Sequence, residues 1–253
     1  MSYQKCGVLG QTFSWVLASF LQDDGLPFAK VLQAEEIDEV MAAEGVSFGN
    51  RKNAVYTPAL VLWGLLWQAL ATGPSRSYQA VVAQLRILCV RLSIRPPSPD
   101  KGAYWRACAK IPARAMQRLT LQVVDQLETC VPRDGLPCTR PVKIVDGTTF
   151  TVPDTEANQA EWPQSPSQKS GIGFPIIRAC VILSLATGAV CGCELGPYQG
   201  KKTGESALLR RMLDRFHRGD IVLADRYYAS YWMIALLLAR GVDVVWLSPR
   251  LVR

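Results

Sequence analysis

The sequence predicts an α/β protein in which a mixed sheet follows a mainly helical domain. In residues 1 to about 130, apolar side chains recur at three- and four-residue spacing, which is typical of helices that bury one face. After a turn-rich segment at residues 131–137, short apolar runs alternate with helical stretches, as in a mixed α/β sheet. Apolar residues make up 49% of the 253 residues, which is enough for a sizeable core.

The first part of the chain is expected to hold four helical regions after an N-terminal amphipathic helix. That first helix would end before Asp23, and no small-residue cleavage pattern of a signal peptide follows it. The other regions, in chain order, are residues 31–43, 59–70, 77–94 and 100–127. Prolines at 96, 97 and 99 separate the last two, and Ile111-Pro112 is expected to break the fourth.

The second part is expected to alternate strands and helices. The predicted strands are residues 142–145, 176–185, 188–195, 220–224 and 242–247, and the predicted helices are residues 204–216 and 230–240. The turn-rich segment between the two parts predicts a helical domain at residues 1–135 and a sheet domain at residues 136–253. The apolar runs 59–67 and 231–239 are too short to cross a bilayer, so both predict buried helices.

The charge distribution favours a polyanionic partner such as nucleic acid. The net charge is +7, and nine basic residues accompany one acid between positions 76 and 118. Arg106, Lys110, Arg114 and Arg118 are spaced four apart, so one continuous helix would place them on one face. The alternative is a basic protein without any such partner. The acidic stretch at residues 23–44 is expected to be a solvated face or an intramolecular cover.

Cysteine and histidine usage argues against a zinc site. The eight cysteines contain no CxxC pair, and His217 is the single histidine, expected at the surface. Cys180, Cys191 and Cys193 lie in apolar strand-like sequence, where a free cysteine is an ordinary core residue. This usage indicates a reducing cytoplasm.

Two aspartates stand at informative positions. Asp146 directly follows the apolar run at 143–145, and Asp225 directly follows the apolar run at 221–224. Acids that end neighbouring strands of one sheet can converge at its edge, and Mg²⁺ prefers carboxylate oxygens. A pair of such ions can clamp the attacking and leaving oxygens of a phosphodiester displacement. The alternative is that each aspartate caps a helix or stabilises a turn.

Four segments in order resemble bacterial insertion-sequence transposases of the insertion sequence 4 family. They are Asp146-Gly-Thr-Thr-Phe-Thr-Val-Pro-Asp-Thr, Gln168-Lys-Ser-Gly-Ile-Gly-Phe-Pro-Ile-Ile-Arg, Gly196-Pro-Tyr-Gln-Gly-Lys-Lys-Thr-Gly-Glu-Ser and Gly219-Asp-Ile-Val-Leu-Ala-Asp-Arg-Tyr-Tyr. The resemblance extends over about residues 143–245. The stretch Gly102-Ala-Tyr-Trp-Arg resembles the family's N-terminal part less distinctively.

The resemblance implies an RNase H-like catalytic domain in which Asp146 and Asp225 are catalytic and bind two Mg²⁺ or Mn²⁺ ions. It implies a DNA transposase that binds terminal inverted repeats of double-stranded DNA as a homodimer, cleaves a strand and transfers it. Such a protein would be located in the bacterial cytoplasm at the nucleoid, with no membrane partner. The residues expected to contact DNA are Arg106, Lys110, Arg114, Lys201, Lys202 and Arg226.

The family also uses a third carboxylate, in a signature of Tyr, two residues, Arg, three residues, Glu, six residues and Lys. The nearest match here is Tyr198, Lys201 and Glu205 with Met212 in place of Lys, and it precedes Asp225, which is the wrong order. We therefore expect the chain to stop before its third carboxylate. A non-catalytic DNA-binding fragment, or an inhibitor of the full-length enzyme, is then the main alternative, ahead of a basic α/β protein unrelated to DNA.

Some residues near these motifs have two interpretations. Lys201, Lys202 and the arginines of residues 210–218 either contact DNA or form a solvated helix face. Glu205 either supports the site or only stabilises the first turn of a helix. Trp162, Tyr227 and Tyr228 either stack on bases or belong to the core.

Overall fold

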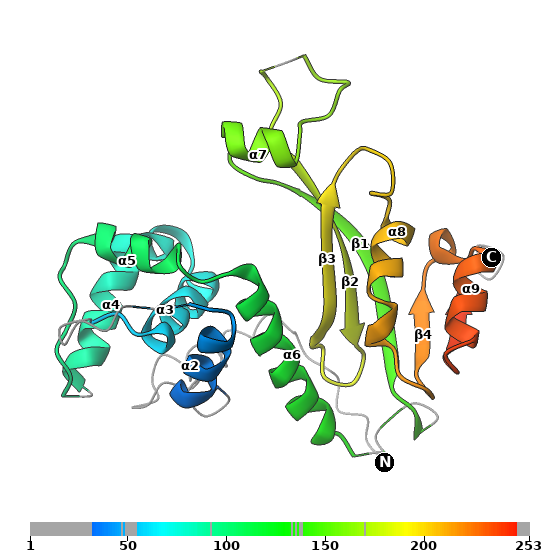
Figure 1. Ribbon diagram of the computed structural model, residues 1–253, viewed down its shortest axis with the longest axis horizontal. Coiled ribbons are helices and arrows are strands. Elements are labelled where there is room, and N and C mark those ends of the chain that lie inside the picture. The colour runs from blue at the N-terminus through cyan, green and yellow to red at the C-terminus, as the bar shows by residue number, and fades with distance from the viewer. Residues whose placement is uncertain are drawn as a thin grey trace, which may run out of the picture. The chain divides into compact units, whose positions relative to one another are not determined.

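The computed structural model describes residues 32–246 except 47, 49–54, 92, 133, 135, 137, 138 and 170 (Figure 1). The amphipathic helix expected before Asp23 and the last residues, 247–253, lie outside this part. The chain divides into two compact units, Met1–Leu119 and Thr120–Arg253. This division falls inside helix α6 (Ala113–Thr129) rather than in the turn-rich segment, because the two ends of α6 pack into different cores.

The helical unit contains α2 (Ala34–Ala43), α3 (Pro58–Leu70), α4 (Tyr78–Arg91), α5 (Lys101–Cys108) and the start of α6. These bounds confirm the helices predicted from apolar spacing. The sequence sets the helix starts: the Thr57 hydroxyl accepts the Leu60 N–H at 3.2 Å, and the Asp100 carboxylate accepts the Gly102 N–H at 3.0 Å. Gly64 of α3 allows close packing, since a Cβ there would stand 2.8 Å from the Tyr104 hydroxyl oxygen.

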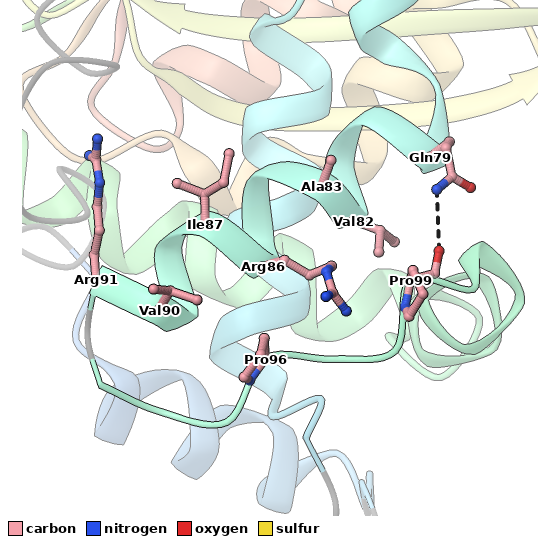
Figure 2. A pocket seen from close by; sticks show the side chains of 9 residues that line it. All are labelled: Gln79, Val82, Ala83, Arg86, Ile87, Val90, Arg91, Pro96 and Pro99. Carbon is pink, nitrogen blue, oxygen red and sulfur yellow. Dashed lines mark hydrogen bonds between the residues drawn. The ribbon is translucent and has the colours of Figure 1, made fainter.

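The proline segment between α4 and α5 folds back along α4. The Gln79 side chain donates to the Pro99 carbonyl at 3.2 Å, and Arg86 donates to the Pro97 carbonyl. Figure 2 shows the resulting pocket of about 510 Å³, lined on one side by α4 residues that include Ile87 and Val90. Because Arg86 is engaged with the backbone of this segment, it contributes to local structure more than to the surface charge.

The expected basic helix face is broken. Residues 100–127 form two helices, α5 and α6, and the break lies at Ile111-Pro112 as predicted. Arg106 therefore lies on α5, Lys110 lies between the helices, and Arg114 lies on α6. These residues do not share one continuous helix face, as the expected break implied, because a proline inside a helix removes a backbone donor and clashes with the preceding turn.

The second unit is built on a five-stranded mixed sheet (Figure 1). Its strands are β1 (Val142–Thr151), β2 (Ile176–Ser184), β3 (Val190–Pro197), β4 (Ile221–Ala224) and β5 (Asp243–Trp246), in the spatial order β3-β2-β1-β4-β5. Strands β1 to β3 pair antiparallel, whereas β4 pairs parallel to both β1 and β5. This order and these directions are those of an RNase H-like sheet, which confirms the predicted fold class.

Three helices accompany the sheet: α7 (Glu156–Glu161), α8 (Glu205–Arg211) and α9 (Tyr231–Leu238). The helix expected at 204–216 is shorter, because the chain passes into a 3₁₀ turn at Leu213–Arg215. No helix in the described part of the chain is long and apolar enough to span a membrane. The run 231–239 is helical, but Tyr231 and Trp232 are exposed, so its prediction as a wholly buried helix is wrong.

The core of this unit lies on one face of the sheet. Val145 and Val222 from the sheet pack in one cluster with Leu208 and Leu237 from the helices. Cys180 and Cys191 belong to this core, as expected, whereas Cys193 is exposed, contrary to expectation. Cys193 points to the other face because side chains alternate along a strand, and its position pairs with Val181 on that face.

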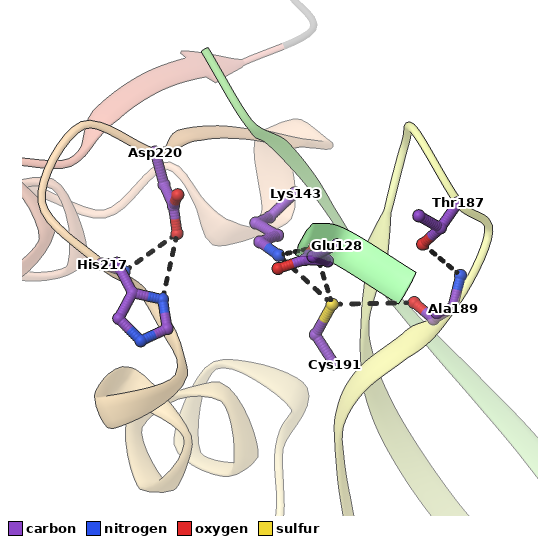
Figure 3. Close-up of polar contacts among 7 residues, drawn as sticks. All are labelled: Glu128, Lys143, Thr187, Ala189, Cys191, His217 and Asp220. Carbon is purple, nitrogen blue, oxygen red and sulfur yellow. Dashed lines mark hydrogen bonds and ion pairs between the residues drawn. The ribbon is translucent and has the colours of Figure 1, made fainter. Parts of the chain in front are cut away.

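A buried ion pair joins α6 to the sheet (Figure 3). The Lys143 side chain on β1 is only 2% exposed, and its ammonium group binds the Glu128 carboxylate. The Cys191 sulfur lies 3.4 Å from the same nitrogen. Glu128 and Lys143 therefore fix the end of α6 against the sheet that carries the candidate site.

Candidate active site

Asp146 lies within strand β1, and its carboxylate is exposed. The sequence placed this residue just after a strand that ended at Val145, and that boundary is wrong. β1 continues to Thr151 because residues 146–151 pair with β2 in unbroken antiparallel register. The continuation, residues 146–151, is mostly exposed and mostly polar, so it lacks the apolar alternation from which strands are predicted.

Asp225 directly follows strand β4, as predicted, and its backbone remains extended, with φ −75° and ψ 171°. Parallel pairing of β1 with β4 places Val145 opposite Ala224. One residue further along both chains, Asp146 therefore stands beside Asp225. Neighbouring strands lie about 4.8 Å apart, and side chains at matched positions share a face. Val145 and Ala224 both belong to the buried core of this unit. Because successive side chains of a strand point to opposite faces, the two aspartates point to the other face.

Each carboxylate accepts a hydrogen bond from a backbone N–H group one or two residues further along the chain. One oxygen of Asp146 accepts the Gly147 N–H at 2.8 Å, and one oxygen of Asp225 accepts the Tyr227 N–H, also at 2.8 Å. The other oxygen of each carboxylate accepts no hydrogen bond from the described residues. Two exposed carboxylates with one free oxygen each are thus presented side by side.

A polar contact beneath the sheet supports this pair. The Glu205 carboxylate, on α8, lies over Gly147 and accepts the hydroxyl of Tyr228 at 3.1 Å. Tyr228 is 1% exposed, and burial followed by the nearby Cys180 and Glu205 raises the pKa of its phenol far above the ordinary value. The phenol therefore remains a neutral donor. This contact connects the residue after Asp146 with the turn that follows Asp225.

Gly147→Ala is expected to break the Glu205–Tyr228 contact. A Cβ at position 147 would stand 2.1 Å from the Glu205 carboxyl carbon, so the glutamate must move away. The Tyr228 hydroxyl would then keep only the Cys180 sulfur, a weak partner 3.8 Å away, and losing its carboxylate partner costs about 1–3 kcal/mol. Urea unfolding of Gly147→Ala, Tyr228→Phe and the double variant measures this. Fully additive losses would contradict the account, since both changes remove the same hydrogen bond.

Three of the predicted DNA-contacting residues lie in the same unit as the carboxylates. Arg226 directly follows Asp225, and Lys201 and Lys202 lie in the turn between β3 and α8, all exposed. Lys202 has a positive φ of 64°, and its carbonyl accepts the Arg211 guanidinium at 3.3 Å. The turn is therefore held in one conformation that displays two ammonium groups.

The other three lie in the helical unit. Arg106 and Lys110 both line a pocket of about 420 Å³ together with Phe48 and Tyr56. The Lys110 ammonium stands 5.6 Å from the centroid of the Phe48 ring. Burial raises the pKa of Tyr56, in the same pocket, to about 12. Arg114 is exposed on α6. The structure thus brings Arg106 and Lys110 to one pocket.

The remaining candidates divide between core and surface. Tyr228 is core, Trp162 is half-buried, and Tyr227 is exposed. His217 is at the surface, as expected, with its ring nitrogen 4.0 Å from the Asp220 carboxylate (Figure 3).

Tyr231 and Trp232 were not identified from the sequence as candidate site residues, and both are exposed, as Tyr227 is. Their signal was weak, because an apolar run does not show which side of a short helix faces solvent.

Asp146 on β1 and Asp225 directly after β4 thus lie at neighbouring positions of an RNase H-like sheet. Residues 137–247 match the family model described as the transposase DDE domain, a little under half of the chain. This match includes the four motifs and agrees with the resemblance that they indicated. None of the curated proteins is significantly similar to the chain.

Three solved structures of Mos1 are similar over most of the chain. The Mos1 transposase paired-end complex with left transposon end is 14% identical, with 92% of this chain and 76% of that chain covered, at a TM-score of 0.28. The Mos1 mariner paired-end complex with Mn is 14% identical, with 93% and 77% covered, at 0.24. The pre-cleavage Mos1 transpososome is 13% identical, with 92% and 76% covered, at 0.25.

Proposed function

We propose that the chain is a DNA transposase of the insertion sequence 4 type, which binds terminal inverted repeats and acts on them by metal-dependent strand cleavage and strand transfer. The observation that carries the proposal is the adjacency of Asp146 and Asp225 on parallel strands, inside residues that match a transposase DDE domain. A homodimer on paired ends, in the bacterial cytoplasm at the nucleoid, belongs to the same proposal.

The donor set fits a hard divalent cation such as Mg²⁺ or Mn²⁺. Such ions take oxygen ligands, and Mg²⁺ is commonly held by one or two carboxylates together with substrate phosphates and water. Asp146 and Asp225 supply exposed carboxylate oxygens at neighbouring positions. When bound there, a divalent cation supplies charge neutralisation at the phosphodiester and lowers the pKa of its bound water.

The chain's own residues orient the DNA around this pair. Arg226 and the ammonium groups of Lys201 and Lys202 bind phosphate oxygens and so place the backbone against the carboxylates. The backbone N–H groups of Gly147 and Tyr227 hold the two carboxylates in fixed orientations. Positioning of this kind matters because a displacement of about 1 Å can lower the rate by around 10²-fold.

The helical unit supplies affinity through Arg106, Lys110 and Arg114. Each neutralised phosphate is expected to change the slope of log affinity against log salt by roughly −0.9. Arg114→Ala should therefore reduce the slope of the full chain on duplex DNA by about one unit. Asp125→Asn, an exposed change on the same helix, should leave the slope unaltered or steeper. Anisotropy titrations over a salt series measure both, and an unchanged slope for Arg114→Ala would assign that residue to a solvated surface.

A non-catalytic role in DNA binding, including inhibition of a complete enzyme, is the second candidate. It is favoured by the absence, among the described residues, of any group of three acidic, histidine or cysteine side chains placed to hold a metal. Within that part of the chain, only two carboxylates meet at the site. In this reading the chain occupies transposon ends without cutting them.

One experiment separates the two candidates and tests the proposal itself. The purified chain is incubated with Mg²⁺ or Mn²⁺ and DNA that carries the terminal repeats of its own element. The proposed transposase should bind the repeats about 10³-fold or more tighter than unrelated duplex and cleave them, whereas the non-catalytic candidate should show the same selective binding without cleavage. Efficient cleavage that is lost in Asp146→Ala would establish a working nuclease. Equal affinity for repeat and unrelated DNA would contradict end recognition.

A further inference from the structure

Three exposed aromatic side chains lie directly after Asp225. Tyr227, Tyr231 and Trp232 are 61%, 76% and 73% exposed, which is unusual for such large rings. The rings of Tyr231 and Trp232 meet edge to face, with centroids 5.4 Å apart and an interplanar angle of 79°. Met233 and Leu237 are the buried residues of α9, and Leu236 packs against the same core, whereas the two aromatic residues of the first turn are exposed to solvent.

This aromatic surface is fixed relative to the candidate metal ligand. The Tyr227 N–H donates to Asp225 at 2.8 Å, and the neighbouring Tyr228 is buried and bonded to Glu205. The Ser230 hydroxyl accepts the Met233 N–H at 3.2 Å and so sets the start of α9. The short connection from Asp225 to α9 is therefore anchored at both ends, by the Asp225–Tyr227 and Ser230–Met233 hydrogen bonds.

Cationic groups border the same surface. Arg226 lies between Asp225 and the first ring. The Tyr227 hydroxyl lies against Gly204, 3.7 Å from the position that a Cβ would take there, which places the ring beside the turn that carries Lys201 and Lys202. Within that turn, the Thr203 hydroxyl donates to the Gly200 carbonyl at 3.0 Å. Exposed aromatic faces flanked by fixed cations are the combination that binds single-stranded nucleic acid.

We propose that Tyr227, Tyr231 and Trp232 form a stacking platform for unpaired bases of the DNA strand that flanks the scissile phosphate. The inference rests on the proposed transposase function and specifies the form of DNA at its site. In an intact duplex both faces of each base are covered by its neighbours, so exposed rings gain contact only with bases that have left the stack. The platform therefore selects ends whose terminal pairs are opened, and the cations bind the backbone of the same strand.

The test compares two forms of one DNA end bound by the full chain. Anisotropy titrations use a labelled blunt duplex and the same duplex with several unpaired nucleotides at the end, in Ca²⁺ to avoid cleavage. The wild-type chain should bind the opened end more tightly. The Tyr231→Ala/Trp232→Ala variant should lose roughly 5- to 150-fold for each base no longer stacked, on the opened end alone.

Two control variants accompany this measurement. Trp232→Phe keeps an aromatic face and should retain most of the affinity for the opened end. Phe174→Ala removes a 57% exposed ring that precedes β2, at the end of the sheet where β1 finishes, and should change neither affinity. Circular dichroism and thermal unfolding confirm that each variant is folded, which is expected because all the replaced rings are exposed.

Each other outcome has a defined meaning. Equal binding of opened ends by the wild type and the double variant would overturn the platform while leaving DNA-end binding intact. A change in sedimentation without a change in DNA affinity would overturn it in favour of a contact between copies of the chain. If the wild-type chain bound neither DNA form, the proposed function itself would fail. That result differs from failure of the platform alone, in which the wild-type chain still binds DNA ends.

Discussion

Glu128→Ala is expected to lower the free energy of unfolding of the sheet unit by about 3–5 kcal/mol. Glu128 is the partner of Lys143, whose side chain is 2% exposed on β1. Removing the carboxylate leaves a buried ammonium group without a counter-ion. Cys191, 3.4 Å away, is a weak acceptor and cannot replace it, since burial raises the pKa of its thiol and keeps it neutral.

Two controls isolate the ion pair as the cause. The Glu128→Ala/Lys143→Met variant removes both charges and should recover most of the loss, because an apolar side chain is well tolerated where the ammonium was buried. Asp243→Ala breaks the exposed pair with Arg140, which has an N–O distance of 2.6 Å, and should cost less than about 1 kcal/mol. Urea midpoints compare all variants. An equal loss in the single and double Glu128 variants would show that packing, not the unpaired charge, is responsible.

The same pair predicts how stability depends on pH. Burial alone would raise the pKa of Glu128, but the hydrogen bond and charge of Lys143 outweigh it, and the pKa lies below the usual 4.5. A carboxyl group whose pKa is lowered by folding stabilises the protein at pH values above its ordinary pKa. This stabilisation is lost as the pH falls through the lowered pKa of the folded protein. For Lys143, burial alone would lower the pKa, but the same partner raises it above 10.5, so its contribution is lost only in strong alkali. The wild-type advantage over Glu128→Ala should therefore shrink in acid, where Glu128 becomes neutral and Lys143 stays charged.

Local sequence patterns predicted the elements that depend on local chemistry. Apolar spacing predicted α3 to within one residue and α4 with an end three residues too late, and the prolines at 96–99 marked the break before α5. The strands were recovered in order, because each buried strand is bounded by turn residues. Asp225 was placed correctly since it ends a short apolar strand, a signal that needs no knowledge of its neighbours in space.

Features set by contacts distant in sequence could not be predicted in this way. β1 extends past Asp146 because it pairs with β2, which begins at Ile176, and its exposed second half carries no apolar alternation. Lys143 was treated as part of a strand, without any sign that Glu128 would neutralise it. The exposure of Trp232 likewise depends on which side of α9 the core occupies.

The sequence identified the two aspartates of the candidate site but not the contacts that bring them together. Motif resemblance selected Asp146 and Asp225, but their adjacency follows from the parallel register of β1 and β4, which only the sheet defines. Glu205 was weighed as a helix-end residue or a supporting one. Its position over Gly147 and its bond to Tyr228 favour the supporting role.

The second large effect concerns divalent cations. Asp146→Asn and Asp225→Asn are each expected to weaken Mn²⁺ binding by about 100-fold or more, because loss of even an outer partner of a metal ligand costs roughly 10- to 100-fold. The amide keeps the size of the side chain but removes the charge that a hard cation requires. The double variant should be little worse than either single variant, since the two carboxylates act on one site. Asp214→Asn, at an exposed aspartate in the 3₁₀ turn after α8, is the matched control.

The most direct test of the paired-carboxylate site is a Mn²⁺ titration of the full chain followed by electron paramagnetic resonance, which counts free and bound ions. We expect saturable Mn²⁺ binding by the wild-type chain and by Asp214→Asn. We expect that binding to be lost in both Asp146→Asn and Asp225→Asn. Retention of wild-type affinity by either of these two variants would contradict it, because the adjacent carboxylates would then not share a metal.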